Sequence, residues 1–294
     1  MNLEEQRNED LRRAKEIIDM GIIPYTFQEY AAFYSFSNEQ INQIYSQIDF
    51  TNYHTALTVL SSGDHAFNAI YKGIDNVDTF DVNRLTEYYA LGFKKRAIEC
   101  LTFAQFCSLY TSSNSAEIKD LEDEVIKNMD EVYKKFWQNY KYELKCYAEH
   151  FPSILMWAKE YRSPEGGVYN IYLDSEETYK YLQKRLEVAK ITFTQANITE
   201  LPIKFGEYDF IELSNILCYK KQIFSNNVKL HSKKLIIDVF KKNLNSNGLM
   251  LYQTGSGNLL KSPFMSKQLK RAQRFYKDSD DYACVFGLQK GGRK

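Results

Sequence analysis

The chain has 294 residues, of which 44% are hydrophobic and 26% are charged. This length and balance suit one large domain, or one domain that carries a helical insertion. No stretch approaches the ~20 consecutive apolar residues that a membrane-spanning helix needs. The charged N-terminus lacks the apolar core of a signal peptide, so we expect neither a leader nor a spanning segment.

Charge is balanced over the whole chain, at 38 basic and 38 acidic residues, and therefore predicts no partner by itself. Its distribution is uneven, because residues 218–294 hold 16 Lys and Arg against four acids, a net charge of +12. Such a segment predicts either contact with an anionic lipid or nucleic acid, or an ordinary solvated helix surface.

The five cysteines and four histidines show no metal-ligand or disulfide spacing. An odd cysteine count with apolar neighbours is typical of buried reduced thiols, so we expect a cytoplasmic protein. No metal site is expected from these patterns.

Two helices are predicted first, over residues 3–20 and 27–48, the second from the apolar spacing of Ile41, Ile44 and Tyr45. Strand-like segments alternate with helix-length segments after them, which predicts a mostly parallel, Rossmann-like α/β sheet flanked by helices. We expect an N-terminal helical segment over 1–52 and the sheet domain over 53–294. The predicted strands are 56–60, 77–81, 190–194, 208–213, 248–252 and 283–288.

The connection between the second and third strands is far longer than a crossover needs. We predict a long helix over 84–106 and then a mostly helical insertion at about 107–165, with Phe136 and Trp137 in its core. This insertion either covers an edge of the sheet or forms a lid over the carboxyl ends of the strands, where such folds bind ligands.

The end of the first strand carries the most informative motif. The apolar run 57–60 stops at Ser61, Ser62, Gly63 and Asp64, and a helix-like segment begins at once. The second strand then ends in Asp81, about twenty residues later. This layout is typical of a nucleotide-binding βαβ unit, in which glycine admits the ligand and the acidic residue accepts hydrogen bonds from ribose hydroxyls. One glycine alone makes neither a dinucleotide fingerprint nor a P-loop.

Polar groups also follow the other predicted strands. Asn83 lies just after Asp81, Asn197 and Ile198 follow the third strand, and Ser214 and Asn215 follow the fourth. Each alone predicts only a turn or a helix cap. Taken in order, they predict a ligand site along one edge of the sheet, with Asn197 placed for an adenine edge.

These motifs together resemble the S-adenosylmethionine-dependent class of Rossmann-like transferases. The first motif departs from the methyltransferase pattern, since it lacks the usual acidic residue and triple glycine. A narrower resemblance is to the betaine-lipid-synthase family of S-adenosylmethionine:diacylglycerol 3-amino-3-carboxypropyltransferases. It covers roughly residues 30–290 and rests on Ser61-Ser62-Gly63-Asp64, Phe80-Asp81-Val82-Asn83, Phe136-Trp137 and Leu213-Ser214-Asn215-Ile216.

The resemblance implies an enzyme that uses S-adenosyl-L-methionine as co-substrate and transfers its 3-amino-3-carboxypropyl group. Methyl transfer and a non-catalytic nucleoside-binding protein remain as alternatives. Asp64 is expected to hold the methionine ammonium or to cap a helix, and His65 is either a base or a structural residue. The implied cofactor-binding residues are Ser61, Ser62, Gly63, Asp64, Asp81, Asn83, Asn197, Ile198, Ser214 and Asn215.

The expected acceptor is a small or lipid-like molecule rather than a nucleic acid. No recognition helix, stacking platform or zinc module accompanies the basic C-terminal third. Peripheral contact of that third with an anionic membrane is a further expectation.

Overall fold

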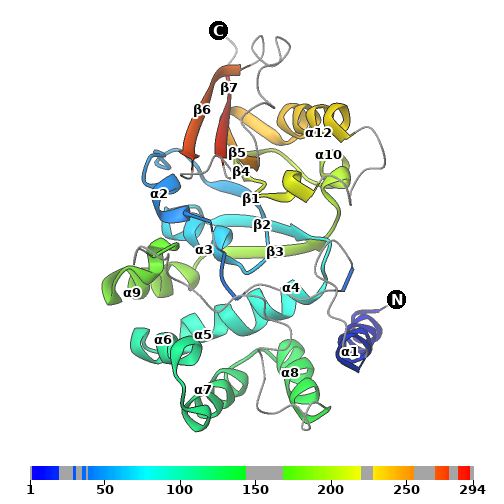
Figure 1. The fold of residues 1–294 in the computed structure, drawn as a ribbon, viewed down its shortest axis with the longest axis vertical. Helices are drawn as coiled ribbons and strands as arrows, with labels where there is room; N and C mark the ends of the chain where they lie inside the picture. The colour runs from blue at the N-terminus through cyan, green and yellow to red at the C-terminus, as the bar shows by residue number, and fades with distance from the viewer. Residues whose placement is uncertain are drawn as a thin grey trace.

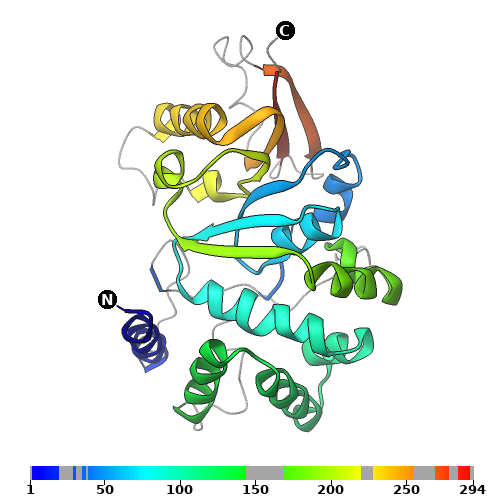
Figure 2. The same cartoon turned by 180° about the vertical axis from the view of Figure 1, so that it is seen from behind.

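A seven-stranded sheet runs through the structure, a computed structural model, and helices pack around it (Figure 1; Figure 2 from behind). No helix of the described part is long and apolar enough to cross a membrane. The structure describes residues 2–19, 29–30, 35–37, 39–143, 168–219, 228–254, 269–277 and 284–291.

The strands lie in the order β3-β2-β1-β4-β5-β7-β6. The first five in the chain pair in parallel, and β7 is antiparallel to both of its neighbours, β5 and β6. This confirms the predicted fold class of a mostly parallel, Rossmann-like α/β sheet. The strands are β1 (Thr55–Val59), β2 (Asn76–Asp81), β3 (Lys190–Gln195), β4 (Tyr208–Glu212), β5 (Leu244–Thr254), β6 (Leu269–Lys277) and β7 (Cys284–Lys290).

The six predicted strands all exist, with shifted ends, whereas the prediction missed β6. Strand β6 reads Leu-Lys-Arg-Ala-Gln-Arg-Phe-Tyr-Lys and lies at the edge of the sheet. Edge strands are commonly rich in charge, which prevents pairing with another chain. With so many charged residues, β6 lacks the apolar alternation from which a strand is predicted.

The helices of the described part fall before β1 and between the strands up to β5. They are α1 (Leu3–Asp19), α2 (Ile41–Tyr45), α3 (Asp64–Tyr71), α4 (Leu85–Glu87), the π-helix η1 (Tyr88–Lys94), α5 (Lys95–Cys100), α6 (Phe103–Thr111), α7 (Ser115–Lys127), α8 (Glu131–Glu143), η4 (Ile171–Leu173), α9 (Glu176–Leu186), η5 (Ile198–Glu200), α10 (Leu201–Lys204), η6 (Ile216–Tyr219) and α12 (Val228–Asn243).

Two helix predictions need correction. Within the described part of 27–48, only α2 is helical; residues 35–37, 39 and 40, here called the crossing segment, are not. The predicted helix 84–106 stops at Cys100, because Leu101 is extended and Thr102 starts α6 through a capping box with Gln105. The predicted helix 3–20 is confirmed as α1.

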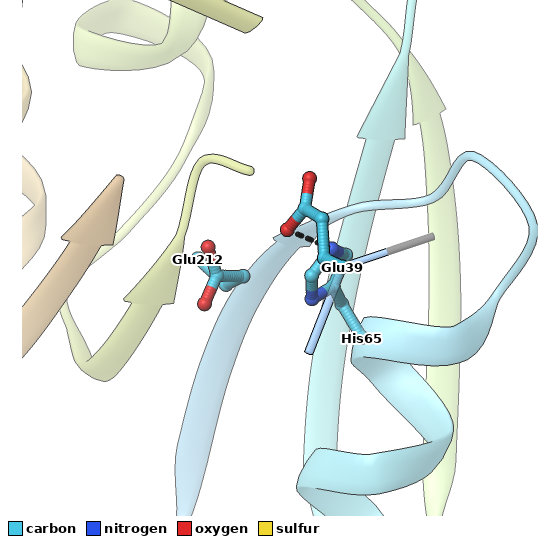
Figure 3. Close-up of side chains that lie close together, drawn as sticks. All are labelled: Glu39, His65 and Glu212. Atoms are coloured by element: carbon cyan, nitrogen blue, oxygen red, sulfur yellow. Dashed lines mark ion pairs between the residues drawn. The ribbon is translucent and has the colours of Figure 1, made fainter. Parts of the chain in front are cut away.

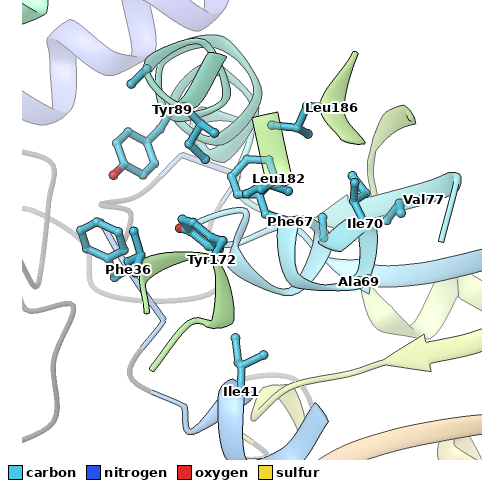
Figure 4. Close-up of a cluster of buried hydrophobic side chains, with 14 of the residues drawn as sticks. Phe36, Ile41, Phe67, Ala69, Ile70, Val77, Tyr89, Tyr172, Leu182 and Leu186 are labelled. Carbon is cyan, nitrogen blue, oxygen red and sulfur yellow. The ribbon is translucent and has the colours of Figure 1, made fainter. Parts of the chain in front are cut away.

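Two hydrophobic cores lie on opposite faces of the sheet. Adjacent residues of β1 face them alternately, with Ala56 in one core and Leu57 in the other. Figure 4 shows part of the first core, in which Phe67 of α3, Leu182 of α9 and Tyr172 gather with Phe36 of the crossing segment. Helices α10 and α12 cover the second core through residues such as Leu201 and Val239.

Helices α6, α7 and α8 lie beyond η1 and α5, away from the sheet (Figures 1 and 2). Phe136 and Trp137 are buried at 4% and 0% exposure, which confirms their prediction as core residues. The insertion reaches the crossing segment where Tyr110 packs on Phe36, with ring centroids 4.7 Å apart. Residues 144–167 lie outside the described part, so the lid stays a prediction. The domain boundaries also stay a prediction.

Candidate functional site

The carboxyl ends of β3, β2, β1, β4 and β5 share one edge of the sheet, because these strands are parallel. After β1 the chain turns to β2 on one side, and after β3 it returns to β4 on the other. The strand order therefore reverses between β1 and β4, and open α/β sheets bind ligands at that point. All of the sequence-predicted site residues lie at or shortly after the strand ends along this edge.

The loop between β1 and α3 turns sharply at Gly63, which precedes the first helical residue, Asp64. Gly63 has a φ of +84°, and a Cβ there would lie 2.7 Å from the ring of Phe67. Its amide donates a hydrogen bond to the Leu60 carbonyl at 2.6 Å. Glycine is therefore required by both backbone conformation and space, and the predicted strand–turn–helix motif is confirmed.

Asp64 is fully buried and accepts four hydrogen bonds. Lys94 Nζ and the Tyr172 hydroxyl donate to Oδ1 at 2.7 and 2.6 Å. The Ser62 hydroxyl and the Ser37 amide donate to Oδ2 at 2.8 and 2.6 Å. With both oxygens engaged and Lys94 supplying the opposite charge, Asp64 holds the loop in place rather than offering a free carboxylate to a ligand ammonium.

Lys94 joins the crossing segment to this loop. Besides Asp64, its Nζ donates to the carbonyls of Ser35 and Ser62 at 2.8 and 3.2 Å, and it lies 4.0 Å from the ring centroid of Phe36. Burial lowers the pKa of Lys94 to about 8, although the negative charge of Asp64 acts to raise it. Lys94 ends the π-helix η1, and π-helical turns occur frequently at functional sites.

Asp81 joins the loops that follow three strands. Its Oδ2 accepts from the Ser61 amide at 3.0 Å and its Oδ1 from the Asn83 amide at 2.9 Å. Its backbone carbonyl accepts from the Ala196 amide after β3 at 3.0 Å. Burial raises the pKa of Asp81 to about 6, although these backbone hydrogen bonds act in the opposite direction.

Asn83 and Asn197 both cap the helical turns that follow their strands. Asn83 Oδ1 accepts from the Leu85 amide at 3.1 Å, and Asn197 Oδ1 accepts from the Thr199 amide at 3.1 Å. Ile198 is 2% exposed and belongs to the second core. The structure thus brings these residues to the predicted edge in capping and packing roles, and the adenine contact of Asn197 stays a prediction.

Glu39, His65 and Glu212 meet at the reversal point between β1 and β4 (Figure 3). One ligand-type atom from each lies within 4.8 Å of the other two. Glu39 Oε2 and His65 Nε2 form an ion pair at 3.2 Å. Ser214 connects the carboxylates, because its hydroxyl donates to Glu39 and its amide donates to Glu212 Oε1 at 2.9 Å. Asn215 also donates its amide to Glu39.

The protonation of this cluster follows from burial and mutual charge. Burial opposes a charged imidazole, but the carboxylate of Glu39 outweighs it and raises the pKa of His65 to about 9. Burial raises the pKa of Glu212 to about 7, with the charge of His65 acting against it. His65 therefore carries a proton at neutral pH and is not ready to accept one, so the candidate role as base does not fit this state of His65.

Four residues of the site escaped the sequence analysis: Glu39, Lys94, Tyr172 and Glu212. Glu212 had a usable signal, since it ends an apolar strand as Asp81 does. Lys94 gave no such signal, because it is followed directly by Lys95 and Arg96 and so belongs to what looks like a solvated basic stretch. Glu39 and Tyr172 reach the site through tertiary packing and had no local signal.

A surface hollow of about 300 Å³ lies elsewhere, between α1 and α8. None of the sequence-predicted site residues lines it. Arg7, Leu11, Val132 and Phe136 are among its walls. We therefore locate the candidate site by the convergence of side chains at the strand ends, and not by this hollow.

Comparison with known proteins finds no matching family model and no matching curated protein. The narrower betaine-lipid-synthase resemblance is therefore not confirmed. Solved structures with a similar arrangement include the N-methyltransferase NodS from Bradyrhizobium japonicum WM9 in complex with S-adenosyl-L-homocysteine, at 8% identity and a TM-score of 0.40, covering 86% of this chain and 84% of that one. The rRNA methyltransferase aviRa from Streptomyces viridochromogenes has 11% identity and a TM-score of 0.40, covering 90% of this chain and 88% of that one. At such TM-scores function has to be argued from the chain's own residues.

Proposed function

We propose that this chain is an S-adenosylmethionine-dependent transferase, with methyl transfer as its reaction. The observation that supports it most is Asp81, which ends β2 and gathers the loops after β1 and β3 beside the reversal point of the sheet. An acidic residue at this position is suited to the two ribose hydroxyls of a nucleoside.

The Asp81 side chain fits that role. It is only half-buried, and backbone amides of Ser61, Val82 and Asn83 hold its carboxylate in orientation. The loop at residues 61–64 would lie under the nucleoside, and Asn197 with Ile198 would lie on the adenine side. Glu212 and Ser214 would then face the acceptor from the end of β4.

Methyl transfer is proposed over aminocarboxypropyl transfer because of Asp64. Both reactions bind the methionine chain, but aminocarboxypropyl transfer also needs that chain turned so that its γ-carbon faces the acceptor, and Asp64 was the residue expected to bind its ammonium. Lys94 and Tyr172 already donate hydrogen bonds to the Asp64 carboxylate. Orientation of the reacting carbon toward the nucleophile decides between the two reactions, and no described residue favours the γ-carbon.

Product analysis tests the function directly. The protein is incubated with S-adenosylmethionine and cell extract, and the nucleoside products are separated. S-adenosylhomocysteine is the expected product. Methylthioadenosine would indicate aminocarboxypropyl transfer instead, and unchanged cofactor that still binds the protein would indicate a binding module without catalysis.

The acceptor is proposed to be a small or lipid-like molecule rather than a nucleic acid. Most side chains of the basic region 218–294 lie outside the described residues, so peripheral membrane contact stays a prediction. Binding to anionic vesicles and to nucleic acid is compared at several salt concentrations. Tight, steeply salt-dependent binding to nucleic acid with no effect of anionic vesicles would contradict this proposal.

Replacing Asp81 with alanine should weaken S-adenosylmethionine binding at least about tenfold, because hydrogen bonds to a charged group contribute roughly 1.5–3 kcal/mol each. Isothermal titration calorimetry measures the change. Asp78→Ala is the matched control: Asp78 lies in the same strand but bonds Thr192 and Tyr208 instead. Equal affinity in Asp81→Ala and wild type would contradict the assignment of the ribose site.

Binding should also depend on pH through Asp81. The ionised carboxylate is the form that accepts from both hydroxyls, and its pKa is raised to about 6. Affinity should therefore be complete above about pH 7 and fall as the pH drops, by about tenfold at pH 5, where roughly one carboxyl in ten stays ionised. The Asp81→Ala variant should show a flat profile over this range, and a flat wild-type profile would count against the role of Asp81.

A further inference from the structure

The cluster of Glu39, His65 and Glu212 is almost completely buried. The three residues are 8%, 3% and 3% exposed, although each carries an ionisable group. They come from the crossing segment, the first turn of α3 and the end of β4 (Figure 3). Two carboxylates facing one imidazole in a buried site need additional positive charge or protons, because a buried charge is costly unless it is paired or coordinates a metal.

Hydrogen bonding in this cluster is incomplete. His65 Nε2 is paired with Glu39, but His65 Nδ1 is buried without a hydrogen-bond partner within the described part of the chain. The Tyr45 hydroxyl is also buried without a hydrogen-bond partner among the described residues, in the field of both carboxylates. Buried polar groups in native proteins nearly always have partners. Two unpartnered polar atoms at one cluster, His65 Nδ1 and the Tyr45 hydroxyl, therefore point to a missing ligand.

We propose that Glu39, His65 and Glu212 bind a divalent first-row transition cation, such as Zn²⁺ or Mn²⁺. Two carboxylate oxygens and one imidazole nitrogen suit these ions, whereas Mg²⁺ and Ca²⁺ prefer oxygen ligands alone. A separation of up to 4.8 Å between the ligand atoms closes to bonding distance with a small side-chain adjustment, since such bonds are roughly 2.0–2.2 Å long.

The surroundings of the cluster support a binding site. Ser214 donates from its hydroxyl to Glu39 and from its amide to Glu212, which holds both carboxylates in orientation. Hydrogen-bonded ligands of this kind are a general feature of metal sites. Three protein ligands also leave coordination positions open for water or an oxygen of a substrate.

This inference goes beyond the proposed function. Sequence spacing indicated no metal, because the three residues are far apart in the chain and only the parallel sheet and the crossing segment bring them together. The cation would lie at the end of β4, on the acceptor side of the proposed cofactor site.

Calorimetric titration of chelator-stripped protein with Zn²⁺, Mn²⁺ and Mg²⁺, each alone, tests the proposal. We expect one equivalent of Zn²⁺ or Mn²⁺ to bind, much more tightly than Mg²⁺. Glu212→Gln and His65→Asn should each weaken binding by at least about a hundredfold, since even residues that only support a metal ligand contribute 10–100-fold. Glu122→Gln, at a buried glutamate of α7, is the matched control and should bind normally.

Circular dichroism shows whether the variants fold. Pulsed electron paramagnetic resonance of the Mn²⁺-loaded wild type avoids that question, because it should detect one directly bound imidazole nitrogen. Absence of binding, binding that survives in both folded variants, or a spectrum without imidazole nitrogen would overturn the proposal. S-adenosylmethionine binding is measured separately, so a failed metal site leaves the proposed function untouched.

Discussion

Replacing Lys94 with methionine is expected to lower the free energy of unfolding by about 3–5 kcal/mol, the usual cost of removing one partner from a buried ion pair. Lys94 and Asp64 are both 0% exposed and lie 2.7 Å apart. Methionine keeps most of the side-chain volume but leaves the Asp64 carboxylate without its counter-charge. It also removes the donor to the Ser35 and Ser62 carbonyls. Urea denaturation at pH 7 measures the loss.

Lys95→Met is the matched control, because the neighbouring lysine is partly exposed and pairs with Glu99 on the surface. Such a pair contributes about 0–1 kcal/mol. Combining Lys94→Met with Asp64→Asn should recover part of the loss, since the unpaired charge is then gone. A Lys94→Met protein that loses less than about 1 kcal/mol, as an exposed lysine would, would show that the pair is not buried in solution.

The parallel sheet could be predicted because its inner strands have a strong local signature. Strand β1 reads Thr-Ala-Leu-Thr-Val and is buried along almost its whole length. Strands covered on both faces are nearly continuous apolar runs. The loop at residues 61–64 and Asp81 could be placed for the same reason, since the end of a parallel strand fixes the edge on which its loop lies.

The crossing segment could not be predicted, because its conformation depends on distant partners. The apolar spacing of Ile41, Ile44 and Tyr45 correctly indicates α2. Extending that helix backwards fails at Ser35 and Ser37, whose backbone groups bond Lys94 and Asp64 instead. Tertiary hydrogen bonds outweigh a weak helical preference when they satisfy a buried charge.

The same contacts explain why only some residues of the candidate site could be predicted from the sequence. Residues at or just after a strand end, such as Asp81 and Ser214, can be predicted from their position after an apolar run. Glu39 and Lys94 arrive from a non-helical segment and a π-helix, and a π-helix shifts the faces that a regular helical period would assign. The charges that these two residues bring to the site therefore could not be predicted from the sequence.

Replacing Gly63 with alanine should destabilise the protein by about 2–5 kcal/mol, from two separable causes. The left-handed backbone, at a φ of +84°, costs an alanine roughly 1–2 kcal/mol. Overpacking against the buried Phe67 ring costs about 1–3 kcal/mol more. The ring cannot retreat freely, because it packs against Tyr172 at a centroid distance of 6.3 Å. Thermal or urea unfolding measures the total.

Gly73→Ala separates the two causes. Gly73 also has a positive φ, +107°, but a Cβ there would meet nothing within 4 Å, so this variant should lose only the backbone part, about 1–2 kcal/mol. Since Tyr172 donates to Asp64, displacement of Phe67 in Gly63→Ala should also disturb the loop at 61–64 and weaken S-adenosylmethionine binding, whereas Gly73→Ala should bind normally. Equal losses of stability in the two variants would mean that Phe67 moves aside without cost and that Gly63 is required for its backbone conformation alone.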